Sequence, residues 1–130
     1  MSSIASFQTL VQTNLESAKT KLASASDRFT KNPMCGVDFG WHLEMALYDE
    51  LAKYFNELNV ATTAATTSEG LTTMTDELVS ANMRRWMNQL IQETSPIKRD
   101  VWKAILKFWY NVASMYQIKL GELGHFQYSV

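Results

Sequence analysis

Glu44 is the residue whose position is hardest to reconcile with ordinary helix packing. At about 100° per residue, it falls in the apolar arc of a predicted helix, near Leu51 and Phe55. A carboxylate in such a place is costly unless it is paired or hydrogen-bonded. We interpret Glu44 as a candidate buried acid, suited to proton transfer or to binding a small ligand or metal. The simpler alternative is a partner on another helix, such as Lys119 or Asn82, or exposure near the helix end.

His42 and Cys35 are the other side chains that could take part in chemistry. His42 lies one helical turn from Asp38 and two turns from Asp49, and a carboxylate at such a spacing can orient an imidazole. A di-iron bundle requires Glu-x-x-His motifs on two helices, but the residue three places before His42 is not Glu. One cysteine and two histidines are too few for a Cys/His zinc site. We therefore predict no metal, no cofactor and no catalytic residue, with His42 on a solvated helix face and Cys35 in a loop.

Basic residues recur along one side of the last predicted helix. They stand at i, i+4 and i+8, are bordered by tryptophan, and are extended by two arginines of the preceding helix. Phosphate contact combined with aromatic stacking is one interpretation, and it predicts binding to a nucleic-acid backbone. A solvated helix face, paired with Asp100 or with acids of another helix, is the usual explanation. The candidate nucleic-acid residues are Arg84, Arg85, Arg99, Lys103 and Lys107.

Aromatic residues are the main oddity of the composition, with four tryptophans and five tyrosines in 130 residues. One bundle interior can hold many of them, but a second aromatic stripe on the last helix exceeds what its main seam needs. Exposed clusters of this kind favour protein interfaces, whereas a larger core is the competing explanation. The candidate interface residues are Trp102, Trp109, Tyr116, Phe126 and Tyr128.

Length and composition indicate a single domain, residues 1–130, of about the commonest domain size. One cysteine allows no intramolecular disulfide, which fits a reducing compartment. The first residues lack the basic and apolar regions of a signal peptide, and no apolar stretch reaches the roughly 18 residues of a membrane span. The net charge of −1 argues against binding nucleic acid through bulk charge. We expect a cytoplasmic protein without membrane contact.

Between the Gly and Pro breaks, apolar residues recur every three or four positions, which is typical of helices. The broad apolar arcs imply burial against more than one neighbour, as in a bundle. We therefore predict an all-α fold, an antiparallel four-helix bundle with an extended C-terminal tail. The helices are expected over about residues 3–30, 38–58, 72–93 and 96–121.

The helix boundaries and connections follow from the same punctuation. Asp38 is a good N-cap, and Ser95 followed by Pro96 is the clearest helix start in the chain. Residues 59–69 lack helical periodicity, so that we predict a mobile connection there. The last helix is expected to bury one main seam and to leave Trp109 in the second stripe. That main seam is Ile97, Val101, Ile105, Phe108, Val112 and Met115.

These features favour a non-enzymatic helical interaction or assembly module, which self-associates or is a small subunit of a larger complex. The expected partners are a second copy of the chain or another protein. A small all-α subunit that contacts nucleic-acid backbone is the first alternative. A bundle that binds a small ligand or metal near Glu44 is the second.

Overall fold

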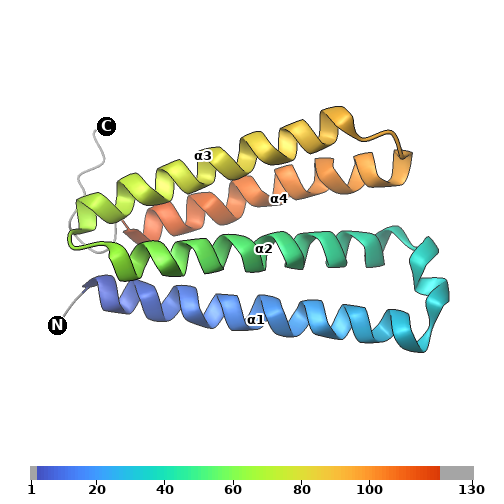
Figure 1. Ribbon diagram of the computed structural model, residues 1–130, viewed down its shortest axis with the longest axis horizontal. Coiled ribbons are helices and arrows are strands. Elements are labelled where there is room, and N and C mark those ends of the chain that lie inside the picture. Colours follow the sequence, from blue (N-terminus) through green and yellow to red (C-terminus); the bar gives the residue numbers. More distant parts are fainter. Residues whose placement is uncertain (1–2, 121–130) are drawn as a thin grey trace.

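The structure, a computed structural model, describes residues 3–120, with the side chains of residues 4–109 except Ser68. Consecutive helices run in opposite directions, and the described residues contain no strand, so that the predicted all-α antiparallel bundle is confirmed (Figure 1). The predicted tail lies outside the described residues. Over residues 3–120, no helix is both long enough and apolar enough to cross a bilayer. The four helices are α1 (Ser3–Lys31), α2 (Phe39–Ala64), α3 (Ser68–Gln92) and α4 (Pro96–Leu120).

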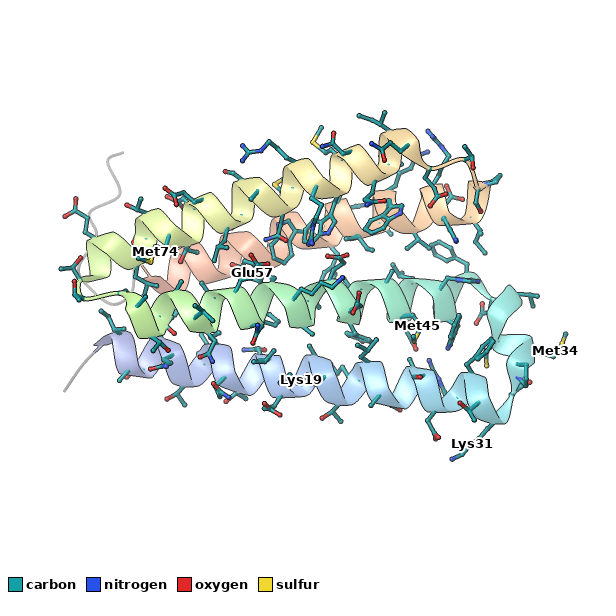
Figure 2. All side chains as sticks on the ribbon, viewed as in Figure 1. Lys19, Lys31, Met34, Met45, Glu57 and Met74 are labelled. Atoms are coloured by element: carbon teal, nitrogen blue, oxygen red, sulfur yellow. The ribbon has the colours of Figure 1, made fainter. Side chains whose placement is uncertain are left out.

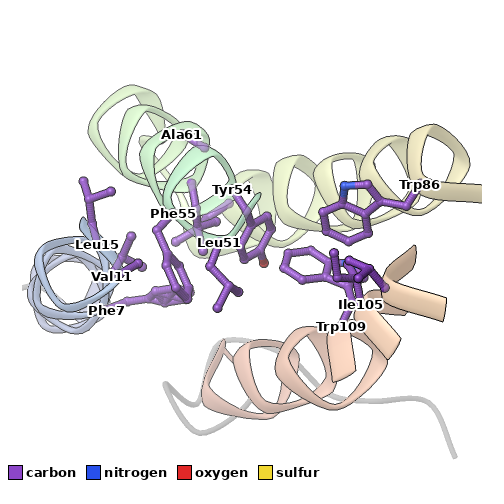
Figure 3. Close-up of a cluster of buried hydrophobic side chains, with 14 residues drawn as sticks. Phe7, Val11, Leu15, Leu51, Tyr54, Phe55, Ala61, Trp86, Ile105 and Trp109 are labelled. Atoms are coloured by element: carbon purple, nitrogen blue, oxygen red, sulfur yellow. The ribbon is translucent and has the colours of Figure 1, made fainter. Parts of the chain in front are cut away.

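α2 is the central helix of the bundle. It packs along α1 on one side and against α3 and α4 on the other, whereas α1 has little backbone contact with α3 or α4. This arrangement explains why the apolar arc of α2 is broad, since two sides of one helix are covered. Fourteen buried apolar side chains of the described residues form one continuous core (Figure 3). Its members include Phe7, Val11 and Leu15 of α1, Tyr54, Phe55 and Leu58 of α2, Leu71 and Trp86 of α3, and Ile105 and Trp109 of α4.

The connection between α2 and α3 is much shorter than predicted. The prediction of a mobile connection over residues 59–69 is wrong, because α2 continues to Ala64 and α3 begins at Ser68. Ala61 and Thr62 are buried against the core. Tertiary packing therefore holds in helical form a Thr-rich stretch whose intrinsic helix propensity is low.

The corner between α1 and α2 is a short 3-10 helix, η1 (Pro33–Val37). A Cβ atom at Gly36 would lie 3.0 Å from the ring of Phe29, so that glycine allows this ring to pack closely. Phe29 in turn stacks on Trp41, with 4.9 Å between the ring centroids. Met34 points away from the bundle at this corner (Figure 2). The ring contacts tie the start of α2 to the end of α1.

α4 buries Val101 and Ile105 of its predicted seam, but beyond Ile105 the core side chain is Trp109 in place of Phe108. Trp109 is 1% exposed, whereas Phe108 is 44% exposed. The indole of Trp109 meets Trp86 and Tyr54 edge-on, at centroid distances of 4.5 and 4.2 Å. The predictions that Phe108 belongs to the core and that Trp109 belongs to an interface are therefore wrong. Steps of three and of four from Ile105 both stay on one helix face, so that spacing does not choose between the two residues.

Replacing Asp38 with alanine is expected to lower the free energy of unfolding by about 1 kcal/mol. Its carboxylate accepts a hydrogen bond from the backbone N–H of Gly40 at 3.2 Å and so caps α2. Urea unfolding followed by circular dichroism measures the loss. Asp27→Ala is the matched control, because it removes an exposed ion pair with Lys31 and should cost less than about 0.5 kcal/mol. Equal losses in the two variants would contradict the capping role.

Candidate functional site

Glu44, the candidate buried acid, is half-exposed and paired. Its side chain is 41% exposed and forms an ion pair with Arg28 of α1. The prediction of a buried carboxylate is therefore wrong. A partner on another helix exists, as the simpler alternative expected, although that partner is Arg28. The position faces α1, because α1 packs along this side of α2.

Among the described side chains, the buried carboxylate is instead that of Glu50, whose side chain is 11% exposed. Its Oε2 accepts a hydrogen bond from Nη2 of Arg85 at 2.6 Å, and Arg85 also donates to Asn82 at 2.7 Å. The ammonium of Lys53 lies 3.9 Å from the other carboxylate oxygen of Glu50, Oε1. This network ties α2 to α3. Glu50 is not among the residues predicted from the sequence, although a step back by four residues from Tyr54 places it on the buried side of α2.

His42 and the acids near it serve the local structure. The Nε2 atom of His42 lies 2.6 Å from the carbonyl oxygen of Gly36, and the imidazole is half-buried rather than fully solvated. Asp38 caps α2, and Asp49 pairs with Lys53 at 3.0 Å, so that neither carboxylate is committed to the imidazole. Within residues 3–120, no three His, Cys, Asp or Glu side chains are close enough to share a metal ion.

Cys35 lies in η1, as the predicted loop position implies. The thiol is half-buried, and its Sγ atom lies 4.0 Å from the carbonyl oxygen of Arg28. No feature of this corner distinguishes the thiol as a nucleophile, and we assign it no role.

The five candidate nucleic-acid residues do not form one basic surface. Arg85 is bound to Glu50. Arg99 donates from Nη1 to the carbonyl oxygens of Leu90 and Glu93, at 3.3 and 3.1 Å. It thereby satisfies carbonyls at the end of α3 that have no partner within the helix. The remaining exposed candidates are Arg84, Lys103 and Lys107.

The predicted interface residues are also divided by the structure. Trp109 is in the core, and Trp102 is half-buried. Tyr116, Phe126 and Tyr128 lie outside the described side chains. On α4, the aromatic side chain that the described core leaves in solvent is Phe108.

Phe108 lines a groove between α1 and α4, and residues of α2 form the floor of this groove. We call it the α1–α4 groove, and its volume is about 490 Å³. It exists because α1 and α4 make little direct contact, so that this side of the bundle stays open. The ammonium of Lys21 lies 5.5 Å from the centre of the Tyr48 ring, within cation–π range. The groove is lined by Asn14, Ser17, Ala18, Lys21, Leu47, Tyr48, Leu51, Phe55 and Phe108.

Comparison of the chain with protein-family models, with curated proteins and with solved structures finds no match in any of the three. We therefore infer function from the geometry of the described residues.

Proposed function

We propose that the chain is a non-enzymatic interaction module, a small subunit that holds a partner protein in the α1–α4 groove. The exposure of Phe108 is the observation that supports this proposal, because a large aromatic ring lies in solvent beside apolar side chains of α2. Covering such a surface provides roughly 25 cal/mol for each Å² of apolar area removed from water. The pairing of Glu44 and the hydrogen bond of His42 support a binding role over a catalytic one.

The shape of the groove suits an α-helix. Leu47, Leu51 and Phe55 stand four residues apart along the floor, which spans about 12 Å, or roughly two helical turns. α1 and α4 flank this floor on its two sides. An amphipathic helix laid between them would place apolar residues at i, i+3 or i+4 and i+7 against the floor.

The charge around the groove selects among helical partners. Lys21 stands on the α1 wall, and the exposed Lys107 directly precedes Phe108 on α4. None of the described lining residues is acidic. A helix whose apolar stripe is flanked by Asp or Glu therefore complements the groove.

A second copy of this chain fits the groove less well. Its exposed apolar pair on α3, Met87 and Ile91, shares one helix face with Arg84. That arginine would approach Lys21 and Lys107, and like charges across an interface are repulsive. We therefore propose a different protein as the occupant.

A labelled peptide tests the proposal. The probe is a fluorescein-labelled amphipathic helix of about 18 residues with leucine on one face and glutamate on both flanks, and a second version carries lysine on the flanks. By fluorescence anisotropy, we expect the acidic peptide to bind at least about tenfold more tightly than the basic one. Phe108→Ser should weaken its binding by at least about tenfold. Val60→Ser, which removes an exposed apolar side chain of α2 outside the groove, is the matched control and should bind as the unmodified protein does.

Three results would overturn the proposal, provided that circular dichroism shows the variants to be folded. Unchanged binding of the acidic peptide by the Phe108→Ser variant would exclude the α1–α4 groove as its binding site. Equal affinity for the two peptides would exclude the charge preference. A dimer that dissociates in the Phe108→Ser variant, measured by light scattering, would make a second copy the occupant and exclude a different protein.

A further inference from the structure

A second hollow lies between the two helical hairpins, at the end where α1 joins α2 and α3 joins α4. α3 and α4 move away from α2 toward this end (Figure 1). Residues 41–49 of α2 are all half-buried, and fully buried positions begin only at Glu50. We call the hollow the hairpin cleft, and its volume of about 460 Å³ is in the range of small-molecule sites. It is lined by Trp41, His42, Met45, Ala46, Gln89, Glu93, Lys98, Val101 and Trp102.

Two indole rings from different helices line the cleft. Trp41 belongs to α2 and is held in place by α1, because its N–H donates to the carbonyl oxygen of Ala25 at 2.9 Å and its ring stacks on Phe29. Trp102 contributes the second ring from α4. A ring that is already fixed loses little conformational entropy when a ligand packs against it. Aromatic faces and edges of this kind favour a planar aromatic ligand.

Lys98 provides the charge that selects the ligand. No ion pair among the described residues includes it. Glu93, the acid of the cleft, already accepts hydrogen bonds at Oε2 from the backbone N–H groups of Thr94 and Ser95, at 3.1 and 3.4 Å. These neutral N–H groups leave Glu93 its negative charge but occupy its Oε2 atom, whereas Lys98 is the charged lining side chain without a partner among the described residues. An anionic group on the ligand would pair with Lys98.

We propose that the hairpin cleft binds a small planar aromatic acid. Its ring packs against Trp41 and Trp102, and its anionic group meets Lys98. The cleft shares no lining residue with the α1–α4 groove, so that a result at one site leaves the other untouched.

Isothermal titration with three naphthalene derivatives tests this proposal. The probe is 2-naphthoate, with 2-naphthamide as the neutral analogue and 2-naphthylmethylamine as the cationic one. We expect saturable binding of 2-naphthoate, at least about fivefold tighter than binding of either analogue. Lys98→Gln should weaken naphthoate binding by about fivefold and leave naphthamide binding unchanged, whereas Trp102→Ala should weaken both. Lys103→Gln is the matched control, because it removes a lysine of α4 that lies outside the cleft.

The outcomes separate this site from its alternatives. Equal losses of 2-naphthoate affinity in Lys98→Gln and Lys103→Gln would show that the overall positive charge attracts the probe, and would overturn the proposal. Preference for the amine would make Glu93 the selecting charge and overturn the choice of an acid. A loss in Phe108→Ser would place the probe in the α1–α4 groove instead. Absence of saturable binding to the folded protein would exclude the cleft as a site for such acids.

Discussion

Replacing Trp109 with alanine is expected to lower the free energy of unfolding by about 3–5 kcal/mol. The indole is fully buried and packs edge-on against Trp86 and Tyr54, so that its removal leaves a large cavity where α2, α3 and α4 meet. A domain of this size is stable by about 5–15 kcal/mol in total. The loss is therefore a large share of the stability, and the variant is expected to unfold at a much lower urea concentration.

Phe108→Ala is the matched control, since it truncates the neighbouring aromatic residue of the same helix. Its ring is 44% exposed, and we expect a loss of about 1 kcal/mol, well below that of Trp109→Ala. Urea unfolding followed by far-ultraviolet circular dichroism compares the two variants. If Phe108→Ala is as destabilising as Trp109→Ala, the assignment of Trp109 rather than Phe108 to the core face of α4 is incorrect.

Replacing Arg85 with leucine is expected to lower the free energy of unfolding by about 2–3 kcal/mol. The change leaves the carboxylate of Glu50 in place, with its side chain 11% exposed and its 2.6 Å hydrogen bond removed. Lys53 remains 3.9 Å from Oε1 of Glu50, beyond hydrogen-bond distance, so that the hydration lost by this buried charge is replaced only in part. The side chain of Arg85 is itself 41% exposed, which puts the expected loss below the about 3–5 kcal/mol typical of fully buried pairs.

The double variant Glu50→Leu with Arg85→Leu separates the free energy of the ion pair from the cost of leaving the Glu50 carboxylate buried without Arg85. Removing both charges leaves no buried ion, and replacement by apolar groups of similar size is often neutral. We therefore expect the double variant to be at least about 1 kcal/mol more stable than Arg85→Leu alone. Glu50→Leu alone, measured in the same urea titrations, completes the thermodynamic cycle. A double variant less stable than Arg85→Leu would show that Glu50 is not stranded in that variant.

The number, type and order of the helices could be predicted because these properties leave a local record in the chain. The apolar positions of α1, from Ile4 to Phe29, repeat at steps of three and four, which only a helix places on one side. Pro96 at the first position of α4 and Asp38 before α2 mark boundaries through their own backbone chemistry. Such signals act over one or two helical turns and need no knowledge of the partner helices.

The candidate sites could be predicted only in part. Trp102 is a predicted protein-interface residue; it is half-buried and lines the hairpin cleft, and its role in an interface stays a prediction. The spacing of apolar residues predicts Phe108 in the core, and it does not distinguish Lys98 from other lysines. Neither the α1–α4 groove nor the hairpin cleft could be foreseen, because each is lined by residues of three helices whose separation is not encoded in any one of them.

By itself, the sequence determined that this protein forms four amphipathic helices in a single bundle. The tertiary structure alone decided which part of each apolar arc is covered: Trp109 instead of Phe108, Glu50 instead of Glu44, and the Thr-rich end of α2 as helix instead of connection. The physical reason is that helical periodicity orients a side chain to a broad face, about a third of the circumference or more. Burial, pairing and helix extension depend on where a neighbouring helix lies along that face. The position of the neighbouring helix is a property of the packed bundle.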